Sequence, residues 1–172
     1  FRDSWQLGEP DLLATMPSPF TISPNVADQY RCFVLPIKAD TDRWVRGMEF
    51  SPGNRAVLHH ALVFADASSG ARRRDYEAPG DGYPCFGIPG FLPAAGYGGW
   101  TPGMQAESYP DGVAFLLPRN ADLVLQLHYT RSPNEQHDQS SVALYFSDKP
   151  PTRRLMDVAL VSRDIDIPPD EP

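Results

Sequence analysis

The stretch ADLVLQLHYTR at residues 121–131 alternates between apolar and more polar side chains along its length. Its apolar members occupy every second position: Leu123, Leu125, Leu127 and Tyr129. A period of two is typical of a β-strand, because successive side chains of a strand point to opposite faces of the sheet. The stretch therefore predicts a strand that carries Gln126 and His128 together on its more polar face.

Further strands are predicted on both sides of this stretch, wherever runs of aromatic and β-branched residues end at turn-forming residues. They cover Tyr30–Ile37, Arg43–Phe50, Arg55–Ala65, Gly112–Leu117, Ser141–Ser147 and Arg153–Ser162. The 19 prolines among the 172 residues are spread along the chain and leave little room for long helices. Seven or eight strands without a helical pattern predict an all-β fold of about eight strands, either an antiparallel β-sandwich or a jelly roll.

The length is that of one ordinary domain. We expect residues 1–29 to be an extended lead-in with at most one edge strand, residues 30–163 to form the domain, and the acidic, proline-rich residues 164–172 to be a linker toward a second domain. Residues 66–112 hold ten of the 13 glycines and predict a long irregular connection, which is often functional when it is ordered.

The charge balance excludes one class of partner. With 15 Lys and Arg against 22 Asp and Glu, the formal net charge is -7. Nucleic-acid binding needs a basic face, so we expect no nucleic-acid partner. No apolar run approaches the roughly 20 residues that span a bilayer, so we expect no membrane span.

Two of the four histidines, His59 and His60, are adjacent. Neighbours in a flat strand point to opposite faces, so one metal ion held by both requires a strong twist, a bulge or a strand end. An isolated pair of this kind is more typical of one core and one surface histidine. His128 on another strand changes this interpretation, because three imidazoles form a plausible site for copper or zinc. His137 lies in a polar run, and we expect it at the surface.

The two cysteines are Cys32, in a predicted strand, and Cys85, in the glycine-rich connection. From spacing alone, a disulfide and a pair of buried free thiols both stay open. A disulfide would fasten the connection, would stabilise the fold by about 4 kcal/mol in the chain-entropy view, and would imply an oxidising compartment.

Five segments in order carry a resemblance to a known family. They are Tyr30-Arg31-Cys32 with Leu35-Pro36, VLHHALVF at 57–64, GWTPG at 99–103, YPDGVAF at 109–115 and LVLQLHY at 123–129. In these segments the chain resembles the N-terminal domain of the copper- and ascorbate-dependent monooxygenases. That family includes peptidylglycine α-hydroxylating monooxygenase, dopamine β-monooxygenase and bacterial relatives.

The resemblance implies a role for each matched residue. It makes residues 30–163 a copper-binding jelly-roll domain in which His59, His60 and His128 bind the first copper. Gln126 and Tyr30 match residues beside that copper, and Cys32 matches a disulfide cysteine whose expected partner is Cys85.

The resemblance also implies a reaction. The first copper would store and deliver an electron, drawn from ascorbate or another donor. A second copper domain of the same polypeptide would use dioxygen to hydroxylate a C–H bond of a small-molecule or peptide substrate. The expected location is extracytoplasmic, either periplasmic or secreted. The chain departs from the family in lacking the further cysteines of the animal enzymes and the His-x-His motif of the second copper site. A non-catalytic jelly-roll binding module and a copper storage or delivery domain stay as alternatives.

Overall fold

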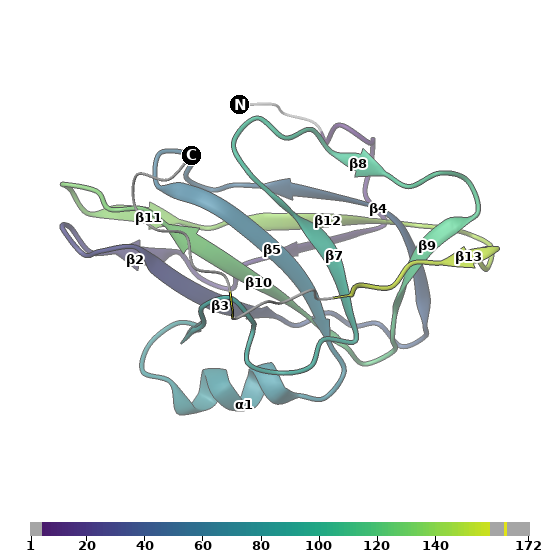
Figure 1. Cartoon of the computed structure of the whole chain (residues 1–172), viewed down its shortest axis with the longest axis horizontal. Coiled ribbons are helices and arrows are strands. Elements are labelled where there is room, and N and C mark those ends of the chain that lie inside the picture. Colours follow the sequence, from purple (N-terminus) through teal and green to yellow (C-terminus); the bar gives the residue numbers. More distant parts are fainter. Residues whose placement is uncertain (1–4, 159–163, 165–172) are drawn as a thin grey trace.

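The computed structural model describes residues 5–158 and residue 164. These residues form a sandwich-like β structure with one short helix (Figure 1). One sheet has the strand order β1 (Leu12–Thr15), β12 (Ser141–Phe146), β4 (Arg43–Ser51), β9 (Val113–Leu117) and β13 (Arg153–Arg154), and β8 (Glu107–Ser108) also pairs with β4. The facing sheet has the order β6 (Tyr83–Pro84), β3 (Gln29–Leu35), β10 (Asp122–Tyr129), β5 (Leu58–Asp66) and β7 (Ala95–Trp100).

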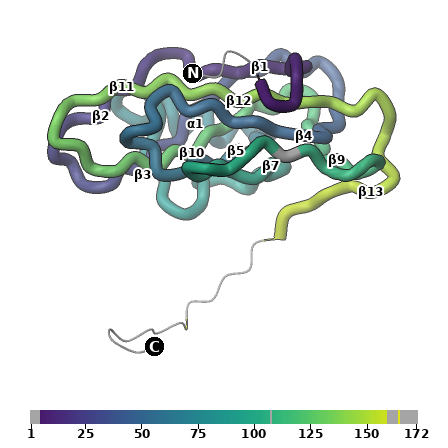
Figure 2. The backbone as a smooth tube through the Cα atoms, turned by 90° about the horizontal axis from the view of Figure 1, so that it is seen from above, coloured from purple at the N-terminus to yellow at the C-terminus, as the bar shows by residue number. Residues whose placement is uncertain are grey.

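A separate pair of short strands marks one end of the sandwich. It joins β2 (Phe20–Ile22) to β11 (Gln136–Asp138), and Figures 1 and 2 show it at the opposite end from β9 and β13. β3 follows β2, and β11 follows β10, so the start of β3 and the end of β10 lie at the β2–β11 end. This end carries the candidate site.

β10 is the central strand of its sheet, and all eight of its residues are buried. The predicted alternation is confirmed, because Leu123, Leu125, Leu127 and Tyr129 belong to the main core. The opposite face is buried as well. There Val124 packs in a second cluster with Cys32, Val34, Ala71, Tyr83 and Cys85, which lies under the helix and the loop that follows it.

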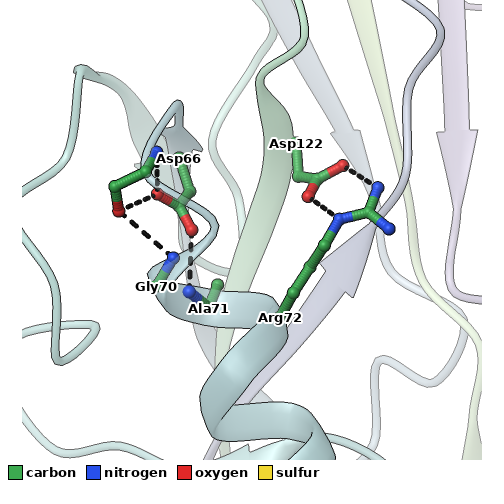
Figure 3. Close-up of polar contacts among 6 residues, drawn as sticks. Asp66, Gly70, Ala71, Arg72 and Asp122 are labelled. Carbon is green, nitrogen blue, oxygen red and sulfur yellow. Dashed lines mark hydrogen bonds and ion pairs between the residues drawn. The ribbon is translucent and has the colours of Figure 1, made fainter.

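The helix α1 (Gly70–Glu77) corrects the expectation that the chain has no helical pattern. In Figure 1 it lies along the β3–β10–β5 sheet on the side away from β12. The buried carboxylate of Asp66 accepts a 2.7 Å hydrogen bond from the backbone N–H of Ala71 in the first turn. The guanidinium of Arg72 pairs with Asp122 on β10 (Figure 3). Two aspartates at the ends of neighbouring strands therefore hold the helix on the sheet.

Other parts of the secondary structure also differ from expectation. The lead-in contains two strands, β1 and β2, where at most one was expected. The connection over residues 66–112 contains α1, β6, β7 and β8, so it is more regular than expected. The strand expected over Arg153–Ser162 is seen only as β13, and residues 159–162 lie outside the described part of the chain. Of the expected linker 164–172, only Asp164 is described.

Among residues 5–158, no helix has the length and apolar character needed to cross a membrane.

Candidate metal centre

A β-bulge brings the two adjacent histidines to the same side of β5. In the antiparallel pairing of β5 with β10, His60 lies opposite His128, whereas Leu58 lies opposite Tyr129. His59 is the extra residue between these pairs and has no partner on β10. An extra residue of this kind re-aims the local side chains, which a regular strand cannot do. The condition for one ion to be held by both histidines is therefore met by the bulge.

The three imidazoles converge through their Nδ1 atoms. The Nδ1 atom of His60 lies 3.1 Å from that of His59 and 3.3 Å from that of His128. One ring nitrogen from each histidine lies within 4.8 Å of the others, so the group could hold a metal ion. Two nitrogens bonded to one ion at roughly 2.0–2.1 Å stand about 2.9–3.4 Å apart for bond angles near 90–110°. The His60–His59 and His60–His128 separations fit this range, and His59 is exposed.

The three histidines differ in burial. His128 is only 5% exposed, His60 is half-buried and His59 is exposed. Burial, followed by the neighbouring rings of His128 and His59, lowers the pKa of His60 below its ordinary value. His60 is therefore neutral near pH 7, the form in which its ring nitrogen can donate a lone pair to a metal ion.

Aromatic rings form a wall behind His128. The ring of Tyr30, which lies opposite His128 on β3, stacks on the imidazole with centroids 4.1 Å apart and an interplanar angle of 8°. Phe86 meets the same tyrosine edge-on at 4.8 Å. Tyr30 was expected beside this site from the family resemblance, whereas Phe86, which directly follows Cys85, was not expected there.

The disulfide forms between Cys32 and Cys85, with Cα atoms 5.9 Å apart. Cys32 pairs with Gln126 across β3 and β10, and the buried side-chain amide of Gln126 lies 3.6 Å from Cys85 Sγ. Gln126 occupies the same face of β10 as His128, two residues along the strand. Gln126 therefore lies between the disulfide and the histidine cluster, and its side-chain contact is with the disulfide.

His137 lies away from the cluster. It lies on β11 rather than in a loop, its side chain is 60% exposed, and its ring contacts Thr21 and Glu135. The expectation of a surface residue is confirmed. Asp28, just before β3, was missed: its Oδ2 atom lies 3.4 Å from the Nε2 atom of His128. No sequence pattern singles out this aspartate, because its proximity to His128 follows from the pairing of β3 with β10.

The chain matches no protein-family model and no curated protein sequence. The family resemblance therefore depends on the five sequence segments, and the metal centre on its own geometry.

Proposed function

We propose that this chain contains the copper-binding, electron-transfer domain of a copper-dependent monooxygenase. The observation that carries the proposal is the convergence of three Nδ1 atoms, on His59, His60 and His128, from two neighbouring strands. An all-imidazole donor set favours copper over zinc at equal geometry. The order of the five segments that resemble the monooxygenases supports the choice of reaction.

Each residue at the site has a distinct part in this function. His59, His60 and His128 hold the copper ion, which supplies one-electron chemistry by changing between its two oxidation states. Tyr30 excludes water from one face of the His128 ring by stacking on it, and Phe86, although mostly exposed, contacts the ring of Tyr30 edge-on. His59 is exposed, so a reductant such as ascorbate has access to the centre from the solvent.

The electron is proposed to pass to a second copper domain of the same polypeptide. In the overall reaction, one oxygen atom of dioxygen enters a C–H bond of a small-molecule or peptide substrate. The other oxygen atom leaves as water, which consumes two electrons and two protons. The disulfide supports an extracytoplasmic place for this chemistry, in the periplasm or outside the cell.

We further propose that the sandwich is a jelly roll. Eight strands have four or more residues, and they lie in the orders β1-β12-β4-β9 and β3-β10-β5-β7. A jelly roll has eight strands in two sheets connected as two Greek keys. In this arrangement β5 and β10, the two strands that carry the histidines, each pair with a strand on both sides within one sheet. The backbone that positions the proposed ligands is therefore hydrogen-bonded on both edges.

A copper storage or delivery domain is the second candidate, and the exposure of His59 favours it, because an exposed ligand lets copper exchange with other carriers. The two functions differ in kinetics. A delivery domain passes copper rapidly to a competing chelator, whereas an electron-transfer domain keeps copper through repeated reduction and oxidation.

The test is titration of the metal-free protein with Cu(II) and, separately, with Zn(II). We expect one Cu(II) per chain, with nitrogen hyperfine structure in the electron paramagnetic resonance spectrum, loss of that signal on adding ascorbate, and its return in air. Failure to bind copper would contradict both candidates and leave a non-catalytic binding module.

A further inference from the structure

One ring nitrogen of the buried ligand His128 faces away from the cluster. This Nε2 atom is buried, and among the described residues it has no hydrogen-bond partner. A carboxylate oxygen of Asp28 lies 3.4 Å from it, close enough for an ion pair but without hydrogen-bond geometry. The two observations are compatible, because an ion-pair contact requires only the distance, whereas a hydrogen bond also requires the N–H to point at the oxygen.

Metal binding at Nδ1 of His128 determines that the proton of the neutral ring lies on Nε2. A neutral imidazole carries one proton, so a ring that gives the lone pair of Nδ1 to a cation carries its proton on Nε2. Nε2 of His128 is then a buried N–H donor, and a buried donor without an acceptor is unfavourable. Asp28 is positioned to accept this hydrogen bond after closing the gap by a few tenths of an ångström.

Stacking on Tyr30 does not determine which edge of the His128 ring faces His60. Tyr30 fixes the plane of the His128 ring, because the two rings are nearly parallel. A half-turn of the ring about its Cβ–Cγ bond preserves that plane but would exchange Nδ1 with a carbon atom. A hydrogen bond from Nε2 to Asp28 favours the orientation in which Nδ1 faces His60.

We propose that Asp28 is a positioning residue of the metal centre: its carboxylate accepts the Nε2–H of His128 and so selects both the tautomer and the ring orientation that present Nδ1 to the metal. Metal-bound histidines commonly donate their second N–H to a carboxylate, and loss of that partner weakens metal binding about 10–100-fold. The inference rests on the proposed metal binding.

The chain offers a matched control pair. Glu135 lies 3.5 Å from Nε2 of His137, and its side chain is 59% exposed, as is that of Asp28. His137 itself is exposed and lies outside the cluster. Removing either carboxylate therefore removes a similar surface charge beside a histidine, while only one of the histidines is a proposed ligand.

The experiment compares Asp28→Ala, Asp28→Asn and Glu135→Ala with the unmutated protein, after thermal unfolding has shown that all four are folded. We expect copper affinity to fall about 10–100-fold in Asp28→Ala, to fall less in Asp28→Asn, whose amide oxygen still accepts a hydrogen bond, and to stay unchanged in Glu135→Ala. In ¹⁵N-histidine NMR spectra of the metal-free protein, we expect a protected Nε2–H signal from His128 that Asp28→Ala abolishes and Glu135→Ala leaves intact.

Two results would overturn the inference: copper affinity in Asp28→Ala equal to that of the unmutated protein, or an unchanged Nε2–H signal in that variant. If the unmutated protein itself binds no copper, the proposed function fails. The NMR comparison of metal-free proteins then still decides whether Asp28 sets the tautomer of His128.

Discussion

The phenol ring of Tyr30 lies almost parallel to the imidazole of His128, with centroids 4.1 Å apart. The two residues are direct neighbours across β3 and β10, so the register of the sheet places one ring on the other. The orientation of a buried candidate ligand is thus built into the strand pairing.

Replacing Tyr30 tests whether this stack supports the centre. Tyr30→Phe keeps the ring, and we expect its copper affinity to match that of the unmutated protein. Tyr30→Leu removes the stack, which contributes about 0.5–1.5 kcal/mol for aromatic pairs, so affinity should fall roughly two- to tenfold. Competition titration against a copper chelator measures both. Equal losses in the two variants would show that the hydroxyl, rather than the ring, matters.

Removing one histidine at a time tests the ligand set. We expect His128→Ala to lose more copper affinity than the roughly 10–100-fold that follows loss of an outer partner, because a direct ligand is gone. His137→Ala is the control, since that ring is exposed and lies on β11. Isothermal titration with copper gives both affinities. Undiminished binding by His128→Ala contradicts the site.

Breaking the disulfide tests how the covering loop supports the site. Cys32→Ala/Cys85→Ala opens a link between residues 53 apart, and we expect the free energy of unfolding to fall by about 4 kcal/mol. Copper affinity should fall as well, because Phe86, the neighbour of Cys85, contacts the ring of Tyr30 that stacks on His128. Urea unfolding and copper titration measure the two effects.

The variant Phe86→Ala separates the effect on copper affinity from the effect on stability. It keeps the disulfide but removes the ring, so it should weaken copper binding with little of the loss in stability.

The mass of the native protein tests the disulfide directly. It should be two hydrogen atoms below that of the reduced chain. Two thiols that react with an alkylating reagent before reduction would argue against the bond.

Acidification should release the metal ion. Coordination needs neutral imidazoles, and an ordinary histidine gains its proton as the pH falls through about 6.5. Burial lowers the pKa of His60, so that ring stays neutral to lower pH than an ordinary histidine does. We expect copper affinity to be at least about tenfold weaker at pH 5 than at pH 7.5. An affinity that is constant over this interval is incompatible with a site made of histidines alone.

The chain by itself should reduce and reoxidise copper without hydroxylating a substrate. Three of its four histidines belong to the cluster, which leaves only His137 for a second site. An oxygen-activating metal needs several ligands and an open position. Copper-loaded protein with ascorbate and oxygen, assayed on peptidyl-glycine and phenethylamine substrates, provides the test. Sustained hydroxylation in proportion to oxygen uptake would show that one site performs both tasks.

The long strands were predictable because their signals are local. The alternation over residues 122–129 and the apolar runs of β3, β4, β5 and β12 reflect burial of regular faces, and burial leaves a periodic pattern in the sequence. The helix gave no such pattern: in α1 only Gly70 and Ala71 are buried. It is held instead by Asp66 and Asp122, whose contacts exist only after the sheet has formed.

β7 was missed for a related reason. Its sequence AGYGGW is rich in glycine, which is typical of loops. At Gly99 the strand approaches β5 so closely that a Cβ atom would lie 2.8 Å from a methyl group of Leu62. Gly99 is thus required by close packing, which the sequence alone does not reveal.

The histidines of the candidate site could be named from the sequence, and the need for a bulge, twist or strand end followed from their adjacency. The position of the β-bulge depends on how β5 pairs with β10, which are far apart in the chain. The contact of Asp28 with His128 likewise depends on strand pairing. The register of strand pairing is set by the combined burial of whole sheet faces, so it cannot be predicted from any single residue.

The extra residue at His59 bears on how such a centre is gained and lost in evolution. A chain without residue 59 would pair Leu58 with Tyr129 and His60 with His128 in an uninterrupted ladder, and the seven pairs from His128 to Asp122 would keep their partners. A single-codon deletion would therefore remove one of the three candidate ligands while leaving the hydrophobic core in place. A single-codon insertion at the same place would restore the third histidine without changing the other pairs of the two strands.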